Sequence, residues 1–161
     1  MEIKVKKRNG RLEDFNAAKV NKCAERACEG LDGTSASDLI LEANVKLFDK
    51  IKTSEIDAAL IEAAKQMFSK DPKYSYVASR LLVSCVYKEV LKESVDCDTF
   101  AQDYQGSFIK NIKAMVRAGY ADPALLKMDL KRLAAAIDPN RDFKFKYLGI
   151  RNLKDRYMFR L

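Results

Sequence analysis

The sequence contains no histidine, and its four cysteines, Cys23, Cys28, Cys85 and Cys97, form no Cys-x-x-Cys pair. A zinc site of paired cysteines and histidines is therefore not expected, and neither is a histidine-based catalytic triad or general base. Cys23 and Cys28 are five residues apart, so they would not share a face of one helix. We expect all four to be reduced thiols, mostly packed in the interior.

Several signatures of enzymes and membrane proteins are also missing. The chain has neither a GxxxxGK[ST] phosphate loop nor a GxGxxG dinucleotide motif, so any nucleotide must be held by another route. No nucleophile lies beside a recognisable base, and we do not expect catalysis by this chain alone. No apolar run reaches membrane-spanning length and no signal peptide is recognisable, which predicts a cytoplasmic protein without a membrane partner.

What the chain does contain is positive charge on a globular composition. Of its 161 residues, 48% are hydrophobic and 33% are charged, and the formal net charge is +7. This balance favours an anionic partner, such as a nucleotide, a nucleic acid or an acidic protein surface. The charge is uneven, because residues 138–161 hold seven lysines or arginines against three aspartates.

Periodicity predicts a mainly α (α+β) fold that begins with a β-hairpin. Residues 2–7 alternate between apolar and basic side chains, Asn9-Gly10 is a two-residue turn signal, and residues 11–15 would form the returning strand. Helical spacing follows, with breaks at glycines and at Asp-Pro pairs. The expected helices cover residues 17–31, 37–49, 53–68, 74–92, 99–118 and 123–136.

The first candidate for function is the pair of cations at the hairpin tip. Lys7 and Arg8 directly precede Asn9-Gly10, where concentrated positive charge is unfavourable unless an anion is near. A charge run of this kind is more often a solvated strand end. Taken alone, the hairpin therefore leaves both interpretations open.

Two further candidates lie on the third and fourth expected helices. Thr53 and Asp57 are four residues apart at the start of a helix, where they either cap it or help to bind phosphate at the exposed N–H groups. Lys88 lies seven residues after Leu81 and so continues an apolar stripe. It either extends outward to solvent or pairs with an anion beside the core.

The order of these features resembles a known family. The resemblance rests on VKKRNGRLEDFNAAKV at residues 5–20, IKTSEID at residues 51–57 and ASRLLVSCVYKEV at residues 78–90. Over residues 2–92 the chain resembles the ATP-cone, the allosteric nucleotide-binding domain at the N-terminus of many ribonucleotide reductase large subunits. NRDFKFKYLGIRNLKDRYMFRL, at residues 140–161, resembles the segment where the class I large subunit enters its catalytic domain.

The resemblance implies a hairpin lid over a four-helix ATP-cone in residues 1–92. Residues 93–161 would be a helical linker and the start of a catalytic domain that is truncated here. In the family the turn usually reads Lys-Arg-Asp-Gly, whereas this chain has Asn9 in place of the acid. Asparagine also suits a turn, so we expect little change.

The resemblance also implies a set of nucleotide-binding positions. Lys7 and Arg8 match hairpin cations that meet the triphosphate, Thr53 matches a helix-start hydroxyl near the phosphates, and Lys88 matches a phosphate-binding lysine. Lys19 matches the start of the first helix, which closes over the nucleotide. The full set is Val5, Lys7, Arg8, Glu13, Asn16, Lys19, Val20, Thr53, Asp57 and Lys88.

The nucleoside end of the ligand falls on other members of this set. Glu13 and Asn16 match positions near adenine, and Val5 and Val20 would supply an apolar shelf for the base. Asp57 matches a position near the ribose, where it could sense the one hydroxyl that separates ATP from dATP.

By the same resemblance, ATP or dATP is an allosteric effector that controls the overall activity of ribonucleoside-diphosphate reductase in deoxyribonucleotide synthesis. Mg²⁺ would arrive on the triphosphate, with no metal ligand from the protein. Expected partners are the rest of the large subunit, an effector-dependent homo-oligomer and, as a further candidate, the small radical-generating subunit.

Two other functions remain as alternatives. A basic helical module that binds nucleic acid is compatible with the charge, although the ATP-cone repressor with a zinc ribbon is excluded because no Cys-x-x-Cys pair is present. Nucleic acid is therefore an unlikely partner. The other alternative is a degenerate cone that has lost nucleotide binding and acts only as a protein-interaction surface.

Overall fold

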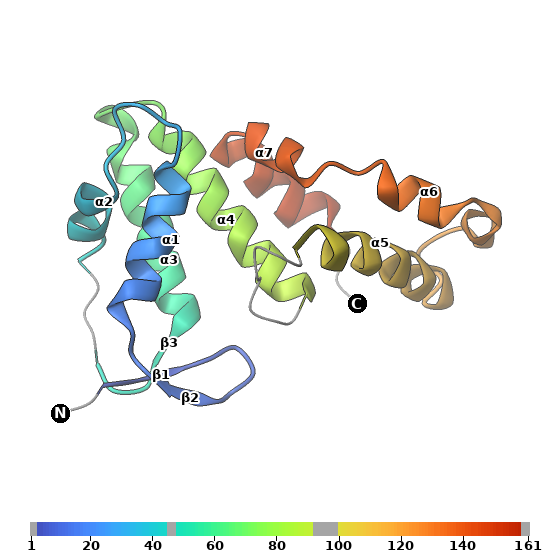
Figure 1. Ribbon diagram of the computed structural model, residues 1–161, viewed down its shortest axis with the longest axis horizontal. Helices are drawn as coiled ribbons and strands as arrows, with labels where there is room; N and C mark the ends of the chain where they lie inside the picture. The colour runs from blue at the N-terminus through green and yellow to red at the C-terminus, as the bar shows by residue number, and fades with distance from the viewer. Residues whose placement is uncertain (1–2, 45–47, 92–99, 159–161) are drawn as a thin grey trace.

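The computed structural model describes residues 3–44, 48–91 and 100–158 (Figure 1). The described part is mainly helical, with one small sheet, which confirms the predicted fold class. The elements are β1 (Lys4–Lys6), β2 (Leu12–Asp14), α1 (Ala17–Cys28), α2 (Ala36–Ala43), β3 (Ile51–Lys52), α3 (Thr53–Gln66), η1 (Met67–Ser69), α4 (Tyr74–Leu91), α5 (Phe100–Arg117), η2 (Pro123–Lys127), α6 (Leu130–Ala135), η3 (Pro139–Lys144), α7 (Tyr147–Asn152) and η4 (Leu153–Tyr157).

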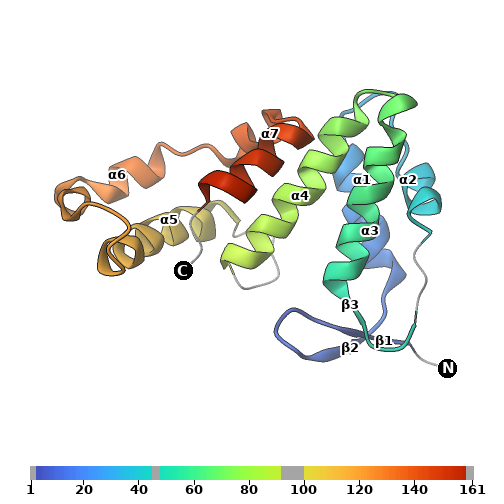
Figure 2. The ribbon, with the colours of Figure 1, turned by 180° about the vertical axis from the view of Figure 1, so that it is seen from behind.

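The three strands form a mixed sheet in the order β2-β1-β3. β1 pairs antiparallel with β2 and parallel with β3, so that Val5 lies between Glu13 and Ile51. Val5 and Ile51 are buried together with Ile56 of α3. This apolar contact fixes the sheet to the end of the helical bundle where α1 and α3 begin (Figures 1 and 2).

The hairpin turn differs from the predicted two-residue turn. The Gly10 N–H donates to the Lys7 carbonyl at 2.9 Å, and the Lys7 N–H donates to the Arg11 carbonyl at 2.8 Å. The loop therefore has three residues, and Gly10 takes the positive φ of 86° that such loops need in their last position. The Asn9 side chain accepts from the Arg11 N–H at 3.1 Å and stabilises this longer loop.

Two predicted helices are wrong in their extent. The helix expected over residues 37–49 ends at Ala43, because Asn44 adopts the left-handed conformation with φ 38°. The chain then enters β3, which the sequence did not predict. The helix expected over residues 123–136 is divided into η2 and α6, since the Asp129 carboxylate caps the Arg132 N–H and starts a new helix.

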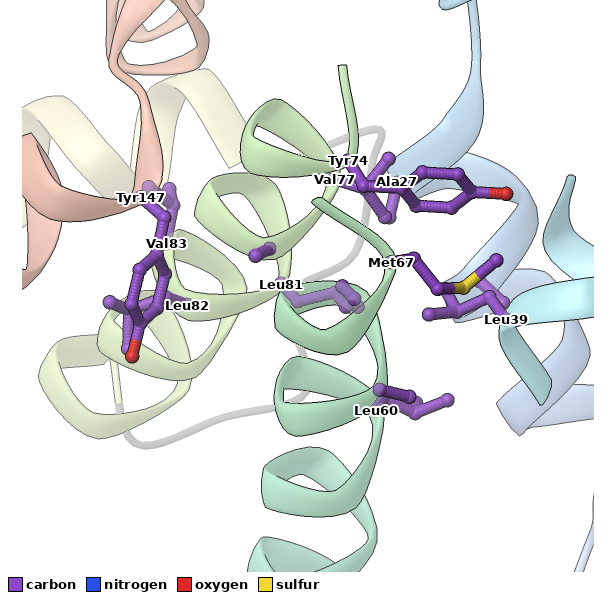
Figure 3. Packing of buried hydrophobic residues seen from close by; sticks show 14 of the residues in the cluster. Ala27, Leu39, Leu60, Met67, Tyr74, Val77, Leu81, Leu82, Val83 and Tyr147 are labelled. Carbon is purple, nitrogen blue, oxygen red and sulfur yellow. The ribbon is translucent and has the colours of Figure 1, made fainter. Parts of the chain in front are cut away.

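The main hydrophobic core lies between α3 and α4, with α1 and α2 against them (Figure 3). Leu60, Tyr74 and Val77 are almost fully buried at its centre. Leu39 packs from α2, and the Tyr74 hydroxyl accepts from the Ser35 N–H at 3.0 Å just before that helix. The core therefore fixes the relative positions of α3 and α4.

The C-terminal segment, defined here as residues 100–158, contacts the opposite side of α4. Tyr147 and Ile150 of α7 are buried in the same core, and the Tyr147 ring meets Phe68 edge-on at 6.2 Å. α5 and α6 extend away from the bundle (Figure 2). No helix in the three described ranges is long and apolar enough to cross a membrane.

Leu60→Ala should lower the free energy of unfolding by about 2–5 kcal/mol, because it leaves a cavity between α3 and α4. Leu41→Ala is the matched control, since that side chain is 78% exposed whereas Leu60 is 1% exposed. Urea denaturation followed by circular dichroism measures both. Equal effects of the two substitutions would contradict this description of the core.

Candidate functional site

Cations from the hairpin and from α4 converge on one carboxylate of α3. The Arg8 guanidinium donates to Asp57 Oδ2 at 3.2 Å and to the Cys85 carbonyl at 3.0 Å. The Lys88 Nζ lies 3.1 Å from Asp57 Oδ1 and 3.3 Å from Oδ2. Asp57 thus joins two cations that lie 49 and 31 residues away in the chain.

The surroundings of Asp57 decide between capping and ion pairing. The N-cap of α3 is Lys52, whose N–H donates to the Glu55 carboxylate at 3.3 Å, so Thr53 is the first helical residue and not the cap. Asp57 follows one turn later, and its side chain is only 14% exposed. The carboxylate is therefore committed to Arg8 and Lys88, while half-buried Thr53 lies at the positive end of α3.

Lys88 is likewise not a lysine that simply extends to solvent. Its ammonium is paired with Asp57 at the edge of the core, and about a third of the side chain is exposed. Of the two interpretations left open by the sequence, the structure supports pairing with an anion. In the structure, that anion is a carboxylate of the same chain.

A second group of charges surrounds Glu13 on β2. The Glu13 carboxylate lies 3.5 Å from the Lys7 ammonium and 3.7 Å from that of Lys19, which is the third residue of α1. Lys7, Arg8, Lys19 and Lys88 form what we call the basic cluster. They come from the hairpin, α1 and α4, and they share two carboxylates, which leaves an excess of positive charge.

The remaining candidates frame this cluster at the same end of the bundle. Asn16 is exposed at the N-cap position of α1, with φ −124°, and accepts the Lys19 N–H through its carbonyl. Val20 is half-buried and packs against the cluster of Val5, Ile51 and Ile56. Val5 is itself buried against Ile51 and Ile56, so it supports the site from the interior.

Sequence reasoning missed two cysteines beside the site. Burial raises the pKa of the Cys85 thiol to about 11, and the Asp57 carboxylate adds to the rise. Burial also raises the pKa of the Cys23 thiol, against an opposing effect of Lys88. Cys85 lies three residues before Lys88, and that helical spacing was the available signal. Both thiols stay protonated at neutral pH, so they offer no nucleophile.

The other thiols add no metal site. Cys28 is a free thiol at the end of α1, and Cys97 falls outside the described residues. In the part of the chain that the structure describes, no group of three or more cysteines, aspartates or glutamates could hold a metal ion.

Comparison with known proteins identifies the fold. The family model described as "ATP cone domain" matches residues 3–89. The chain belongs to the ATP-cone domain family. This membership confirms the resemblance carried by the three sequence blocks and accounts for a hairpin beside four helices.

The relatives of this ATP-cone are much longer proteins. The ribonucleoside-diphosphate reductase subunit alpha of Helicobacter pylori strain 26695 is 36% identical over 98% of the chain, which spans 19% of that relative. Subunit alpha of reductase 1 from Escherichia coli K12 is 30% identical over 96% of the chain and 20% of the relative. The subunit alpha of Chlamydia trachomatis is 38% identical over 82% of the chain and 13% of the relative. The chain thus spans a fifth of these relatives or less.

Arg8→Lys should loosen the hairpin tip, because a lysine cannot reach both the Cys85 carbonyl and Asp57 in the arginine's fork geometry. Loss of one net hydrogen bond should speed amide exchange at Gly10 about two- to tenfold. Arg11→Lys, at an exposed position of the same loop, is the control. Unchanged exchange in Arg8→Lys would show that this contact does not hold the tip.

Proposed function

We propose that this ATP-cone binds ATP or dATP as an allosteric effector and thereby controls the overall activity of a ribonucleoside-diphosphate reductase large subunit. The observation that carries the proposal is the convergence of Arg8 and Lys88 on Asp57, with Lys7 and Lys19 close by. Family membership and homology to reductase alpha subunits support the same function.

The triphosphate would be bound by the basic cluster. Lys7 and Arg8 approach from the hairpin and Lys88 from α4, so a polyanion between them would neutralise charges that Asp57 and Glu13 now share. Each charge-assisted contact contributes about 1.5–3 kcal/mol. The first-turn N–H groups of α3 and the Thr53 hydroxyl are further donors at a positive helix end.

Mg²⁺ would reach this site bound to the triphosphate, without a protein ligand of its own. The described residues place two carboxylates here, Asp57 and Glu13, and each is already ion-paired with lysine or arginine. The ion would then be held by phosphate oxygens and water, which suits the preference of Mg²⁺ for few protein ligands.

Residues at the rim of the basic cluster would select the base and the sugar of the nucleotide. Glu13 and Asn16 supply an acceptor and an amide for the adenine edge, with Val20 as the apolar surface beside them. Asp57, which is ion-paired with Arg8 and Lys88, would sense the ribose hydroxyl directly or through water.

The site makes and breaks no bond in this proposal, and regulation follows from linkage. ATP and dATP must bind different assemblies of the reductase with different affinity, because an effector shifts an equilibrium only by its differential affinity for the two states. The partners would be the rest of the large subunit, a second copy of it and the small radical-generating subunit, all in the cytoplasm.

The C-terminal segment carries the surface for the rest of the large subunit. We propose residues 1–92 as the regulatory domain and residues 93–161 as a linker leading into the catalytic domain. Most of the large apolar side chains that are exposed among the described residues lie in this segment, namely Tyr120, Leu126, Met128, Leu133, Phe143, Phe145, Leu148, Tyr157 and Met158.

Lys7→Ala and Lys88→Ala should each weaken dATP binding at least about tenfold, which corresponds to 1.4 kcal/mol for one lost phosphate contact. Lys131→Ala, at an exposed position of α6, is the matched control and should bind as the parent chain does. Isothermal titration measures all three. If both site variants match the parent chain, the phosphate assignment is wrong.

Titration with nucleotides, together with a DNA-binding assay at several salt concentrations, separates the proposal from its alternatives. Absence of heat with either nucleotide at millimolar concentration would instead favour a degenerate cone that acts as an interaction surface. DNA binding that is tight and falls steeply with salt would favour the nucleic-acid module.

Asp57→Asn should change the ratio of ATP to dATP affinity about fivefold, because it alters one hydrogen-bonding group near the ribose by roughly 1 kcal/mol. Asp38→Asn is the control, since Asp38 is also ion-paired, to Lys70 at 2.6 Å, on distant elements. Circular dichroism checks that both variants fold. An unchanged ratio would confine Asp57 to its ion pairs with Arg8 and Lys88.

A further inference from the structure

Three successive residues near the end of α4 contact three different parts of the protein. The Tyr87 hydroxyl donates to Asp142 Oδ2 of η3 at 2.7 Å, the Lys88 ammonium meets Asp57 of α3 at 3.1 Å, and the Glu89 carboxylate accepts from Lys154 of η4 at 3.0 Å. The two outer residues therefore hold the C-terminal segment, while the one between them belongs to the basic cluster.

Asp142 is the centre of the contact between α4 and the C-terminal segment. Its Oδ2 also accepts from the Tyr104 hydroxyl of α5 at 3.0 Å, and the rings of Tyr87 and Tyr104 meet edge-on with centroids 5.6 Å apart. One carboxylate thus joins α4, α5 and η3. Burial, with a contribution from this carboxylate, raises the pKa of the Tyr104 phenol to about 12, so both phenols remain donors at neutral pH.

The geometry of a helix connects this contact to the basic cluster. Successive residues of an α-helix are separated by about 100° and 1.5 Å. The backbone positions of Tyr87 and Lys88 therefore cannot change independently while this turn of the helix is intact. Tyr87 is buried against the C-terminal segment, and its hydroxyl is bonded to a charged acceptor. A rotation of the last turns of α4 that displaced Lys88 would break this bond, and a hydrogen bond to a charged partner is stronger than one between neutral groups.

We propose that Asp142, through Tyr87 and Tyr104, is a positioning residue that fixes the orientation of Lys88 in the basic cluster and couples effector binding to the placement of the C-terminal segment. The coupling part rests on the proposed function, because it requires a nucleotide at Lys88. The positioning part concerns the chain without any ligand.

Positioning is tested first, without nucleotide. Asp142→Asn removes the charge that both phenols share, whereas Asp155→Asn is the matched control, because Asp155 pairs with Arg151 within the C-terminal segment at 2.6 Å. Amide exchange at Gly10 reports on the hairpin tip through Arg8 and Asp57. We expect exchange at least threefold faster in Asp142→Asn and unchanged in the control. Equal exchange in both variants overturns the proposal.

Coupling is tested by dATP titration of the same two variants. Asp142→Asn should bind about tenfold more weakly, and Asp155→Asn should bind as the parent chain does. The substitution is repeated in Lys88→Ala, where a residue that acts only through Lys88 should lose its effect on affinity. A loss that persists in full in that background overturns the coupling. Tyr104→Phe, expected to bind about threefold more weakly, serves if Asp142→Asn does not fold.

The outcomes separate this inference from the proposed function. A parent chain that binds no dATP overturns the proposed function and the coupling, while the exchange experiment still decides the positioning. A parent chain that binds dATP, with Asp142→Asn binding equally well, overturns the coupling and leaves the effector site in place.

Discussion

The Asp57 carboxylate is the interaction on which the arrangement of the site depends. Without it, the guanidinium of Arg8 and the ammonium of Lys88 would repel each other at the edge of the core, and Arg8 would keep its hydrogen bond to the Cys85 carbonyl alone among the partners that the described residues supply. Removing one partner of a partly buried ion pair is expensive because the remaining charge loses its compensation. The Asp57 side chain therefore joins the hairpin tip to α3 and α4, whose relative positions the main core already fixes.

The position of α4 extends this constraint to the rest of the chain. On one side α4 packs against α3 through the main core, and on the other it packs against Tyr147 and Ile150 of α7. The same helix thus borders both the basic cluster and the C-terminal segment. A shift of α4 that accommodates a ligand must also change contacts beyond residue 92, so regulation at a distance needs no additional element.

Much of the fold could be predicted from the sequence, because many of its elements depend on patterns among neighbouring residues. Alternation in residues 2–7, the capping aspartates before Pro123 and Pro139, and the stripe of α3 are all encoded by neighbouring residues. The strand that the sequence did not predict depends instead on pairing between distant segments. β3 is two residues long and exists because it pairs with β1 across more than forty residues, and no local pattern reports such a pairing.

The candidate site shows the same division between local and distant information. Lys88 could be placed beside the core from its spacing to Leu81, but its partner could not be named, because Asp57 lies 31 residues away. The partner of Arg8 could not be named for the same reason, since its hydrogen bond to the Cys85 carbonyl crosses 77 residues.

The internal ion pairs also determine the free energy that the proposed effector could gain on binding. Arg8 and Lys88 already share Asp57, and Lys7 and Lys19 share Glu13, so the proposed triphosphate would gain only the difference between its contacts and those it replaces. The carboxylates keep the cations ordered and close together before the ligand arrives, which lowers the entropy lost on binding. In the proposed site, the same carboxylates would oppose an anion with too little charge to replace them and would favour a triphosphate over a monophosphate.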